Sequence, residues 1–299
     1  MPAGLPLSAL GIMLLCNVAW ALNVVVSKIA VTTLGLPPLF YTVLRSGVVL
    51  LVLFPLLRRV PARLPLVLAI GFAITGGSFG LQFIGLQTAR PSAVGIVNLA
   101  GAPLTVLFAI LFLGEEVRWR RGLGMALALG GVGLAIGAPS DASDPVGLSY
   151  AFAGVLIGAF ASVFVKRLEV GAVALQAWAA LASLGVMLPA TLLLETGQSA
   201  AVTAAPLAVA ACVLFAGVVV SVGAHSAYFK LFQEHDANLI VPLTLLTPLL
   251  TIAFGTWLTG DTIGWPLIVG GAMALIGVAI IVIRPSRTIR KWQLMRPKL

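Results

Sequence analysis

The side chains that could do chemistry in this chain are neutral polar and aromatic groups set inside long apolar stretches. Their helical spacing would place several of them on one face of each stretch. Aromatic rings can hold another ring or a cation, while amide groups can bind an ammonium or a carboxylate. Such a set suits a zwitterion with a bulky apolar side chain. The candidate cavity residues are Trp20, Asn23, Phe79, Gln82, Asn98, Phe160, Trp178, His225, Tyr228 and Thr244.

Two of these stretches have a proline at the centre and repeat each other. They are NLAGAPLTVLFAILFLGEE at 98–116 and LTLLTPLLTIAFGTWLTGD at 243–261, with Pro103 matching Pro248. Proline removes a backbone donor and kinks a helix, which a membrane tolerates only beside protein or water. The matched placement predicts that both helices line a path and bend there, with Gly101, Pro103 and Pro248 as hinge residues. The alternative is the general enrichment of proline in membrane helices.

The elements that carry these residues must be membrane helices, because the chain is too apolar for a globule in water. Of its 299 residues 60% are hydrophobic and 9% are charged, whereas a soluble domain carries about 25% charged residues. A spanning helix needs about 20 apolar residues. We therefore predict an all-α membrane protein with ten transmembrane helices. The expected spans are roughly 7–28, 38–57, 65–87, 92–112, 119–138, 145–165, 173–194, 206–230, 236–258 and 264–283.

The repeat extends beyond the two proline stretches. AWALNVVVSK at 19–28 parallels IGAFASVFVK at 157–166. The repeating unit holds five spans, so the second copy must enter the membrane from the opposite face. Inverted repeats are typical of secondary transporters, which bind substrate near the midplane and expose it to each side in turn. We expect a first five-span repeat at 1–140, a second inverted one at 141–284, and a basic cytoplasmic tail at 285–299.

The chain has a net charge of +9. Its Lys and Arg residues are distributed unequally between the two sides of the membrane, which argues against a nucleic-acid-binding surface. If both termini lie on one side, that side receives every Lys and Arg except Lys28, Arg45 and Arg90. The positive-inside rule then places both termini in the cytoplasm. The basic tail is expected to bind lipid headgroups, with a specific partner as the alternative. The expected partners are membrane lipids and a small-molecule substrate, with no nucleic acid.

Other sequence features limit the chemistry further. Cys16 and Cys212 lie in apolar spans and are interpreted as small apolar side chains, so we expect no disulfide, metal or cofactor. All nine Asp and Glu fall at span ends or in loops, which predicts weak or no ion coupling. Small residues at 130–133 and 269–277 predict that spans five and ten form packing or dimer surfaces. The chain is expected to be a monomer or a homodimer.

Several ordered motifs carry a family resemblance. They are WALNVVVSK in span one, PPLFYTVLR at 37–45, and P…FLGEEVRWRRGLGMALALGGVGL at 103–134 with its copy P…LTGDTIGWPLIVGGAMALIGVAI in the second half. Together they resemble the drug/metabolite transporter superfamily in its ten-span form with two EamA-type repeats. Within it the chain most resembles bacterial aromatic amino acid exporters. The resemblance implies an inner-membrane exporter of aromatic and other neutral amino acids. The second half departs from the pattern at Gly158 and Asp261, which replace a tryptophan-like position and a glutamate.

Three other functions were weighed. Export of hydrophobic cationic drugs would use the same aromatic cavity, but a mid-membrane carboxylate would favour it and none is present. GGSFG at 76–80 with His225 fits a Ser–His dyad, the mark of a rhomboid-like intramembrane protease. The same glycines also fit a helix-packing motif. A channel would show rings of charge or a carbonyl filter. We therefore expect a carrier and not an enzyme.

Overall fold

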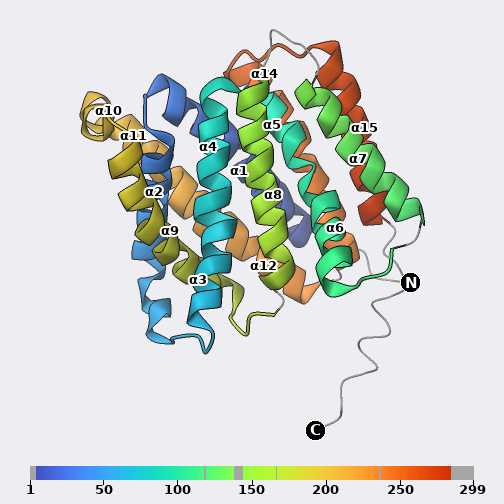
Figure 1. The fold of residues 1–299 in the computed structure, drawn as a ribbon, viewed down its shortest axis with the longest axis horizontal. Coiled ribbons are helices and arrows are strands. Elements are labelled where there is room, and N and C mark those ends of the chain that lie inside the picture. The colour runs from blue at the N-terminus through green and yellow to red at the C-terminus, as the bar shows by residue number, and fades with distance from the viewer. Residues whose placement is uncertain (1–4, 118, 138–143, 166, 236, 284–299) are drawn as a thin grey trace.

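Every regular element in the part of the chain that the computed structural model describes is helical (Figure 1). The described residues are 5–117, 119–137, 144–165, 167–235 and 237–283. Within them, nine helical segments are long and apolar enough to cross a membrane. They are Leu7–Thr33, Pro38–Arg58, Leu64–Thr88, Pro91–Leu113, Pro145–Val165, Ala172–Leu194, Pro206–Leu231, Val241–Leu258 and Trp265–Val282.

The individual helices follow the apolar stretches closely. The first half of the chain contains α1 (Leu7–Lys28), η1 (Ile29–Thr33), α2 (Pro38–Leu53), η2 (Phe54–Arg58), α3 (Leu64–Phe72), η3 (Ala73–Gly77), α4 (Ser78–Thr88), α5 (Pro91–Asn98), α6 (Gly101–Leu113) and α7 (Trp119–Gly137). The second half contains α8 (Pro145–Val165), α9 (Ala172–Leu194), α10 (Gln198–Ala204), α11 (Pro206–Leu214), η4 (Phe215–Ala224), α12 (His225–Glu234), α13 (Ala237–Ile240), η5 (Val241–Leu245), α14 (Leu246–Leu258) and α15 (Trp265–Ile283).

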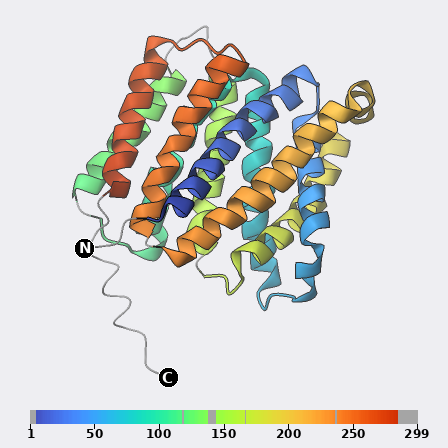
Figure 2. The same cartoon turned by 180° about the vertical axis from the view of Figure 1, so that it is seen from behind.

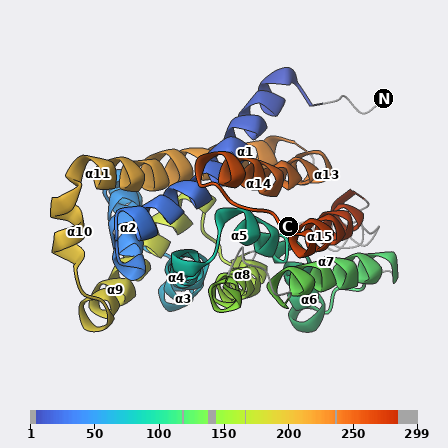
Figure 3. The same ribbon diagram turned by 90° about the horizontal axis from the view of Figure 1, so that it is seen from above.

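The helices form a bundle with the two halves of the chain interleaved. Seen from above, α1, α11 and α14 lie along one side, while α9, α3, α8 and α6 lie along the other (Figure 3). The helices α2 and α5 lie between these two rows (Figure 3). As a result, the middle of the bundle is lined by helices from both halves.

The helices α7 and α15 pack side by side at one edge of the bundle, as Figures 1 and 3 show. A Cβ atom built on Gly124 would lie 2.8 Å from the carbonyl oxygen of Gly277, and one on Gly270 would lie 2.5 Å from that of Gly131. Glycine on both helices therefore lets the two backbones touch. This confirms the predicted packing role of spans five and ten. Although α7 is not among the nine apolar segments, it lies along one of them; Arg120 and Arg121 in its first turn lower its hydropathy.

The two proline-containing spans both lose regular α-helical geometry in the turn before the proline. In the first, α5 ends at Asn98 and α6 begins at Gly101, so an irregular turn precedes Pro103. In the second, the 3₁₀ turn η5 precedes α14 and Pro248. Proline cannot donate to the carbonyl four residues earlier, which explains why regular bonding stops there. Both predicted hinges therefore follow a stretch without regular α-helix, a turn in the first span and the 3₁₀ helix η5 in the second.

The bundle has two distinct ends. The start of α1 and the end of α15 lie at the same end, as the view in Figure 2 shows. We call this the Glu115 end, because the connection after α6 lies there (Figure 1). The opposite end carries the connection between α14 and α15, and we call it the Asp261 end (Figure 1).

Candidate functional site

Three aromatic side chains from the two halves meet between α1 and α12. The ring of Trp20 lies 5.5 Å from that of His225 and 5.4 Å from that of Tyr228, measured between centroids. His225 begins α12 directly after the π-helical segment η4, and its Nδ1 lies 2.9 Å from the carbonyl oxygen of Val220. In a π-helix each backbone N–H bonds to the carbonyl five residues earlier. The His225 ring likewise contacts the carbonyl five residues earlier, that of Val220. The structure thus brings together three of the predicted cavity residues.

A buried arginine lies beside this aromatic group. Arg45 of α2 is only 4% exposed, and its Nε donates to Ser221 Oγ at 2.9 Å. Its guanidinium carbon lies 3.8 Å from the centre of the Phe79 ring and 5.9 Å from that of Phe83. Ser221 in turn donates to the carbonyl oxygen of Ala216 within η4. The predicted residue Phe79 therefore contacts the site through Arg45.

Arg45 lies inside the expected span 38–57 but is not among the cavity residues predicted from the sequence. The signal was present, because a charged side chain within a membrane span usually faces a partner or a functional cavity. Its spacing alone could not show which helix it would meet.

Several buried polar atoms of this region have no hydrogen-bond partner among the described residues. They are Trp20 Nε1, Asn23 Oδ1 and Arg45 Nη1. An unpaired buried polar group is costly, so such atoms deserve an explanation. Two of these are donors and one is an acceptor. Together they could bind a ligand that carries both a negative and a positive group.

Gln82 and Asn98, two further predicted residues, lie on neighbouring helices. Gln82 of α4 is half-buried, and its Nε2 lies 3.4 Å from Ser78 Oγ, a long contact one turn away. Asn98 is half-buried at the end of α5, next to the irregular turn before Pro103. Their proposed contact with substrate stays a prediction.

The remaining predicted residues lie in other surroundings. Trp178 of α9 packs in an apolar cluster with Val67 and Ile70, and its Nε1 has no partner among the described residues. Phe160 of α8 is 40% exposed and packs edge-on against Phe108 and Phe112 of α6. Thr244 donates to the carbonyl oxygen of Val241 in its own span. The structure does not bring these three into contact with the Trp20 group.

The two predicted hinge helices touch each other. A Cβ built on Gly95 of α5 would lie 3.0 Å from Thr251 of α14 and 3.6 Å from the carbonyl oxygen of Pro248. Pro103 and Pro248 are both buried, while Gly101 lies near Val155 of α8. This close crossing couples the two proline-containing spans.

The Asp261 end is held by polar contacts between distant parts of the chain. Asp261, only 8% exposed, accepts bonds from Ser92 N at 2.8 Å and Ser92 Oγ at 2.6 Å in the first turn of α5. Glu195 likewise accepts bonds from the backbone of Leu39 and Phe40 in α2, at 2.9 and 3.0 Å. Carboxylates at helix N-termini satisfy free N–H groups and oppose the helix dipole. Both caps join the second half of the chain to the first.

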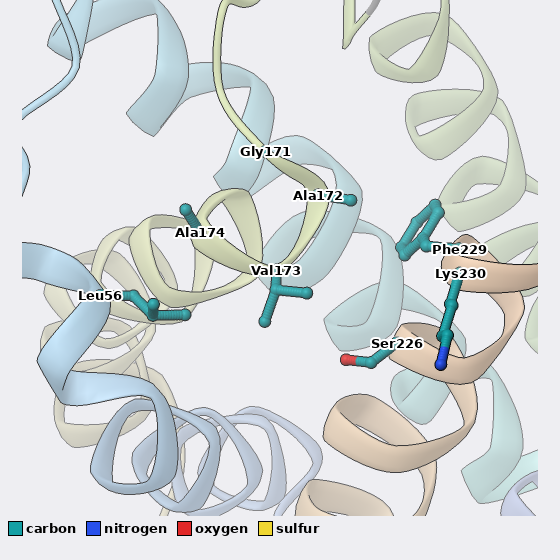
Figure 4. A pocket seen from close by; sticks show the side chains of 8 residues that line it. All are labelled: Leu56, Gly171, Ala172, Val173, Ala174, Ser226, Phe229 and Lys230. Carbon is teal, nitrogen blue, oxygen red and sulfur yellow. The ribbon is translucent and has the colours of Figure 1, made fainter. Parts of the chain in front are cut away.

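A pocket opens at the Glu115 end instead. It has a volume of ≈ 310 Å³ and lies between the start of α9, η2 and α12. Figure 4 shows Ser226, Phe229 and Lys230 of α12 across the pocket from Val173 of α9. Ser226 directly follows His225, so this pocket lies close in the chain to the aromatic group.

Helices that are long and apolar enough to cross a membrane surround this buried polar and aromatic group, an arrangement that fits a membrane transporter. The chain belongs to the EamA-like transporter family, whose model matches residues 7–137 and again residues 145–283. It is therefore a multi-pass membrane protein, and the resemblance inferred from the sequence motifs is confirmed.

Curated relatives and a solved structure extend the match over nearly the whole chain. A protein of Salmonella typhimurium named "Probable amino-acid metabolite efflux pump" is 26% identical over 292 residues, which cover 93% of this chain and 96% of the relative. A protein of Escherichia coli with the same name is 23% identical over 280 residues, covering 89% and 92%. A solved crystal structure, 20% identical, has a TM-score of 0.58 and covers 97% of this chain and 99% of its own. The solved structure shows the shared fold.

Proposed function

We propose that this transporter exports neutral amino acids, the aromatic ones among them, across the bacterial inner membrane. The observation that carries the proposal is the group of Trp20, His225 and Tyr228 together with the buried Arg45. Rings can hold an apolar side chain, and the unpaired polar atoms can bind its charged groups. The names of the two curated relatives point to the same class of cargo.

The proposed architecture is ten spans in two inverted five-span repeats, at residues 1–140 and 141–284. Two matches to one family model support a repeat. The start of α1 and the end of α15 share one end of the bundle, which requires an even number of crossings (Figure 2). The helix α7 supplies the tenth crossing beside α15. In Figure 1, α5 and α6 run from the Asp261 end to the Glu115 end, whereas α14 runs the opposite way, as inversion demands.

The proposed orientation has the Glu115 end, and with it both termini, in the cytoplasm. The connections at that end carry most of the described basic residues, whereas those at the Asp261 end carry Lys28 and Arg90. Short cytoplasmic loops are enriched in Lys and Arg. The basic residues at the Glu115 end are Arg58, Arg59, Arg63, Arg120, Arg121, Arg167 and Lys230.

The proposed mechanism is alternating access, with the described state closed to the outside. Asp261 and Glu195 tie the outer ends of α5 and α2 to the second half of the chain. The pocket beside α12 opens at the opposite end. Bending at Gly101, Pro103 and Pro248 would let the two ends exchange roles.

The rival enzyme reading gains no support from the described contacts. Ser78 Oγ, its nucleophile, lies 3.4 Å from Gln82 Nε2, and His225 contacts Val220. A working dyad needs a hydrogen bond between nucleophile and base. We therefore propose a carrier without catalytic residues.

Purified protein in proteoliposomes tests the proposal through uptake of labelled phenylalanine. We expect saturable uptake that excess tryptophan or tyrosine competes away, and counterflow, which a channel would not show. Uptake should persist when the pH gradient is collapsed, because the sequence places every Asp and Glu at the end of an expected span or in a connection, and proton coupling commonly uses an acid within a span. Transport of methyl viologen without any amino acid uptake would replace the proposal with efflux of hydrophobic cations.

A further inference from the structure

Arg45 is a buried charge without an ion-pair partner among the described residues. Its hydrogen bond is to Ser221 Oγ and its guanidinium lies over the rings of Phe79 and Phe83, all of them neutral groups. Every Asp and Glu of the chain falls at a span end or in a connection. A guanidinium taken out of water is costly unless it is paired. A hydroxyl and a ring face offset only part of that cost.

The guanidinium is also held in place with donor capacity to spare. Its Nε is fixed by Ser221 on the π-helical segment η4, and its face stacks on Phe79. Nη1 has no partner among the described residues. Arginine binds carboxylates through parallel N–H donors in a fixed plane. One hydrogen bond and one ring contact orient the Arg45 guanidinium, and its Nη1 donor has no partner among the described residues. Such an arginine is organised to receive an anion.

The segment η4 connects Arg45 to the aromatic group, because its Ser221 accepts from Arg45 Nε. Ser221 follows Val220, whose carbonyl contacts His225 Nδ1 at 2.9 Å. The ring of His225 packs on Trp20, and Asn23, with its unpaired Oδ1, lies three residues further along α1. Arg45 is therefore linked to the aromatic group through η4, and Asn23 lies on the same helix as Trp20.

We propose that Arg45 binds the carboxylate of the transported molecule, so that the cargo must be a carboxylic acid with an apolar side chain. The ammonium of an amino acid would lie toward Asn23 Oδ1, and its side chain would lie among the rings. This inference rests on the proposed export of amino acids. It adds that the carboxylate is required for binding and names the residue that recognises it.

Ligand-induced thermal stabilisation of the full chain in detergent tests this without requiring transport. Three probes separate the two charged groups: phenylalanine, phenylalaninamide without the carboxylate, and 3-phenylpropionate without the ammonium. We expect phenylalanine and 3-phenylpropionate to stabilise the wild type. Phenylalaninamide should bind about 100-fold more weakly than phenylalanine, because it leaves a buried charge unpaired.

Arg45→Gln should weaken phenylalanine and 3-phenylpropionate about 100-fold for the same reason. Arg63→Gln is the matched control, because Arg63 is exposed at the Glu115 end, and it should bind all probes as the wild type does. Should Arg45→Gln fail to fold, Ser221→Ala provides the second variant. It removes the hydroxyl that orients Arg45 and should weaken the two carboxylate ligands a few-fold without affecting phenylalaninamide.

Each outcome separates this inference from the function on which it rests. Equal binding of phenylalanine and phenylalaninamide to the wild type would leave amino acid export standing and overturn the carboxylate requirement. Wild-type affinity in folded Arg45→Gln would also overturn it. Stabilisation by 3-phenylpropionate alone, lost in Arg45→Gln, would support the anion site while removing amino acids as its cargo. Binding of none of the three probes would overturn both.

Discussion

The ends of α6 and α14 have similar backbone turns but different surroundings. A glycine with positive φ follows each helix, directly after α6 at Gly114 (65°) and after one further residue at Gly260 (66°) behind α14, where other residues would be strained. The acidic residue after each glycine donates its backbone N–H to the carbonyl oxygen six residues earlier. Glu115 N lies 3.3 Å from the oxygen of Ala109, and Asp261 N lies 3.1 Å from that of Gly255. Asp261 is buried on the first turn of α5, whereas Glu115 is exposed. The matched sequences therefore give similar turns after the two helices, but only the Asp261 carboxylate is buried against another helix.

The residue that lies six positions before each carboxylate also differs between the two ends. A Cβ built on Gly255 would lie 2.5 Å from Ser92 Oγ and 2.6 Å from Asp261 Oδ2, so α5 can approach only because Gly255 has none. The matched position in the first half is Ala109, which carries that Cβ. The two ends are therefore not interchangeable, and in the proposed carrier they would close by different contacts.

Among the substitutions that test this difference between the two ends, Asp261→Asn should lower stability most. The change replaces a charged acceptor of the Ser92 N–H and hydroxyl with an amide, and hydrogen bonds to charged groups contribute about 1.5–3 kcal/mol. We expect a loss of roughly 2 kcal/mol in the stability of the closed Asp261 end, seen as a lower thermal unfolding midpoint. Thiol labelling of a cysteine placed at the neighbouring buried Ala93, in a Cys16→Ala, Cys212→Ala background, should also speed up. An unchanged midpoint would mean that the buried cap does not hold this end.

Gly255→Ala should cause the next largest loss of stability. The added Cβ must displace Ser92 or Asp261, and overpacking of this kind costs about 1–3 kcal/mol. Gly133→Ala is the matched control, because a Cβ at Gly133 meets nothing within 4 Å. Circular dichroism melting in detergent should separate the two variants. Equal melting would show that close approach at Gly255 is not what lets this end close.

Part of this picture could be predicted from the sequence, because hydropathy and spacing act locally. Apolar length fixed the spans, and helical spacing selected Trp20, His225 and Tyr228, which do meet. Spacing cannot fix how each helix is rotated or which helix it faces. Phe160 therefore lies in another aromatic cluster, and Arg45 was not recognised as the neighbour of Phe79. The contrast between the two helix ends also depends on neighbours that no local pattern specifies.

Glu195→Gln compares the two helix caps that lie at the Asp261 end. Glu195 caps α2 through Leu39 N and Phe40 N as Asp261 caps α5, but it is only half-buried. Water can replace part of what is lost, so we expect about 1 kcal/mol, typical of a lost helix cap. Thermal unfolding of the single and double variants with Asp261→Asn measures this. Because the caps lie on different helices, the two effects should add within about 0.5 kcal/mol. A larger coupling would show that the two caps close the end as one unit.

Glu115→Gln should have the smallest effect. Glu115 is exposed, and its side chain makes no hydrogen bond or ion pair with the described residues, so stability should change by less than about 0.5 kcal/mol. Counterflow of labelled phenylalanine should also be unchanged, because Ala109 blocks the approach that Gly255 permits at the other end. Slower counterflow at unchanged stability would mean that Glu115 finds a partner in the state where its own end closes. Ala109→Gly, which removes the blocking Cβ, should then bring the Glu115 end closer to the behaviour of the Asp261 end.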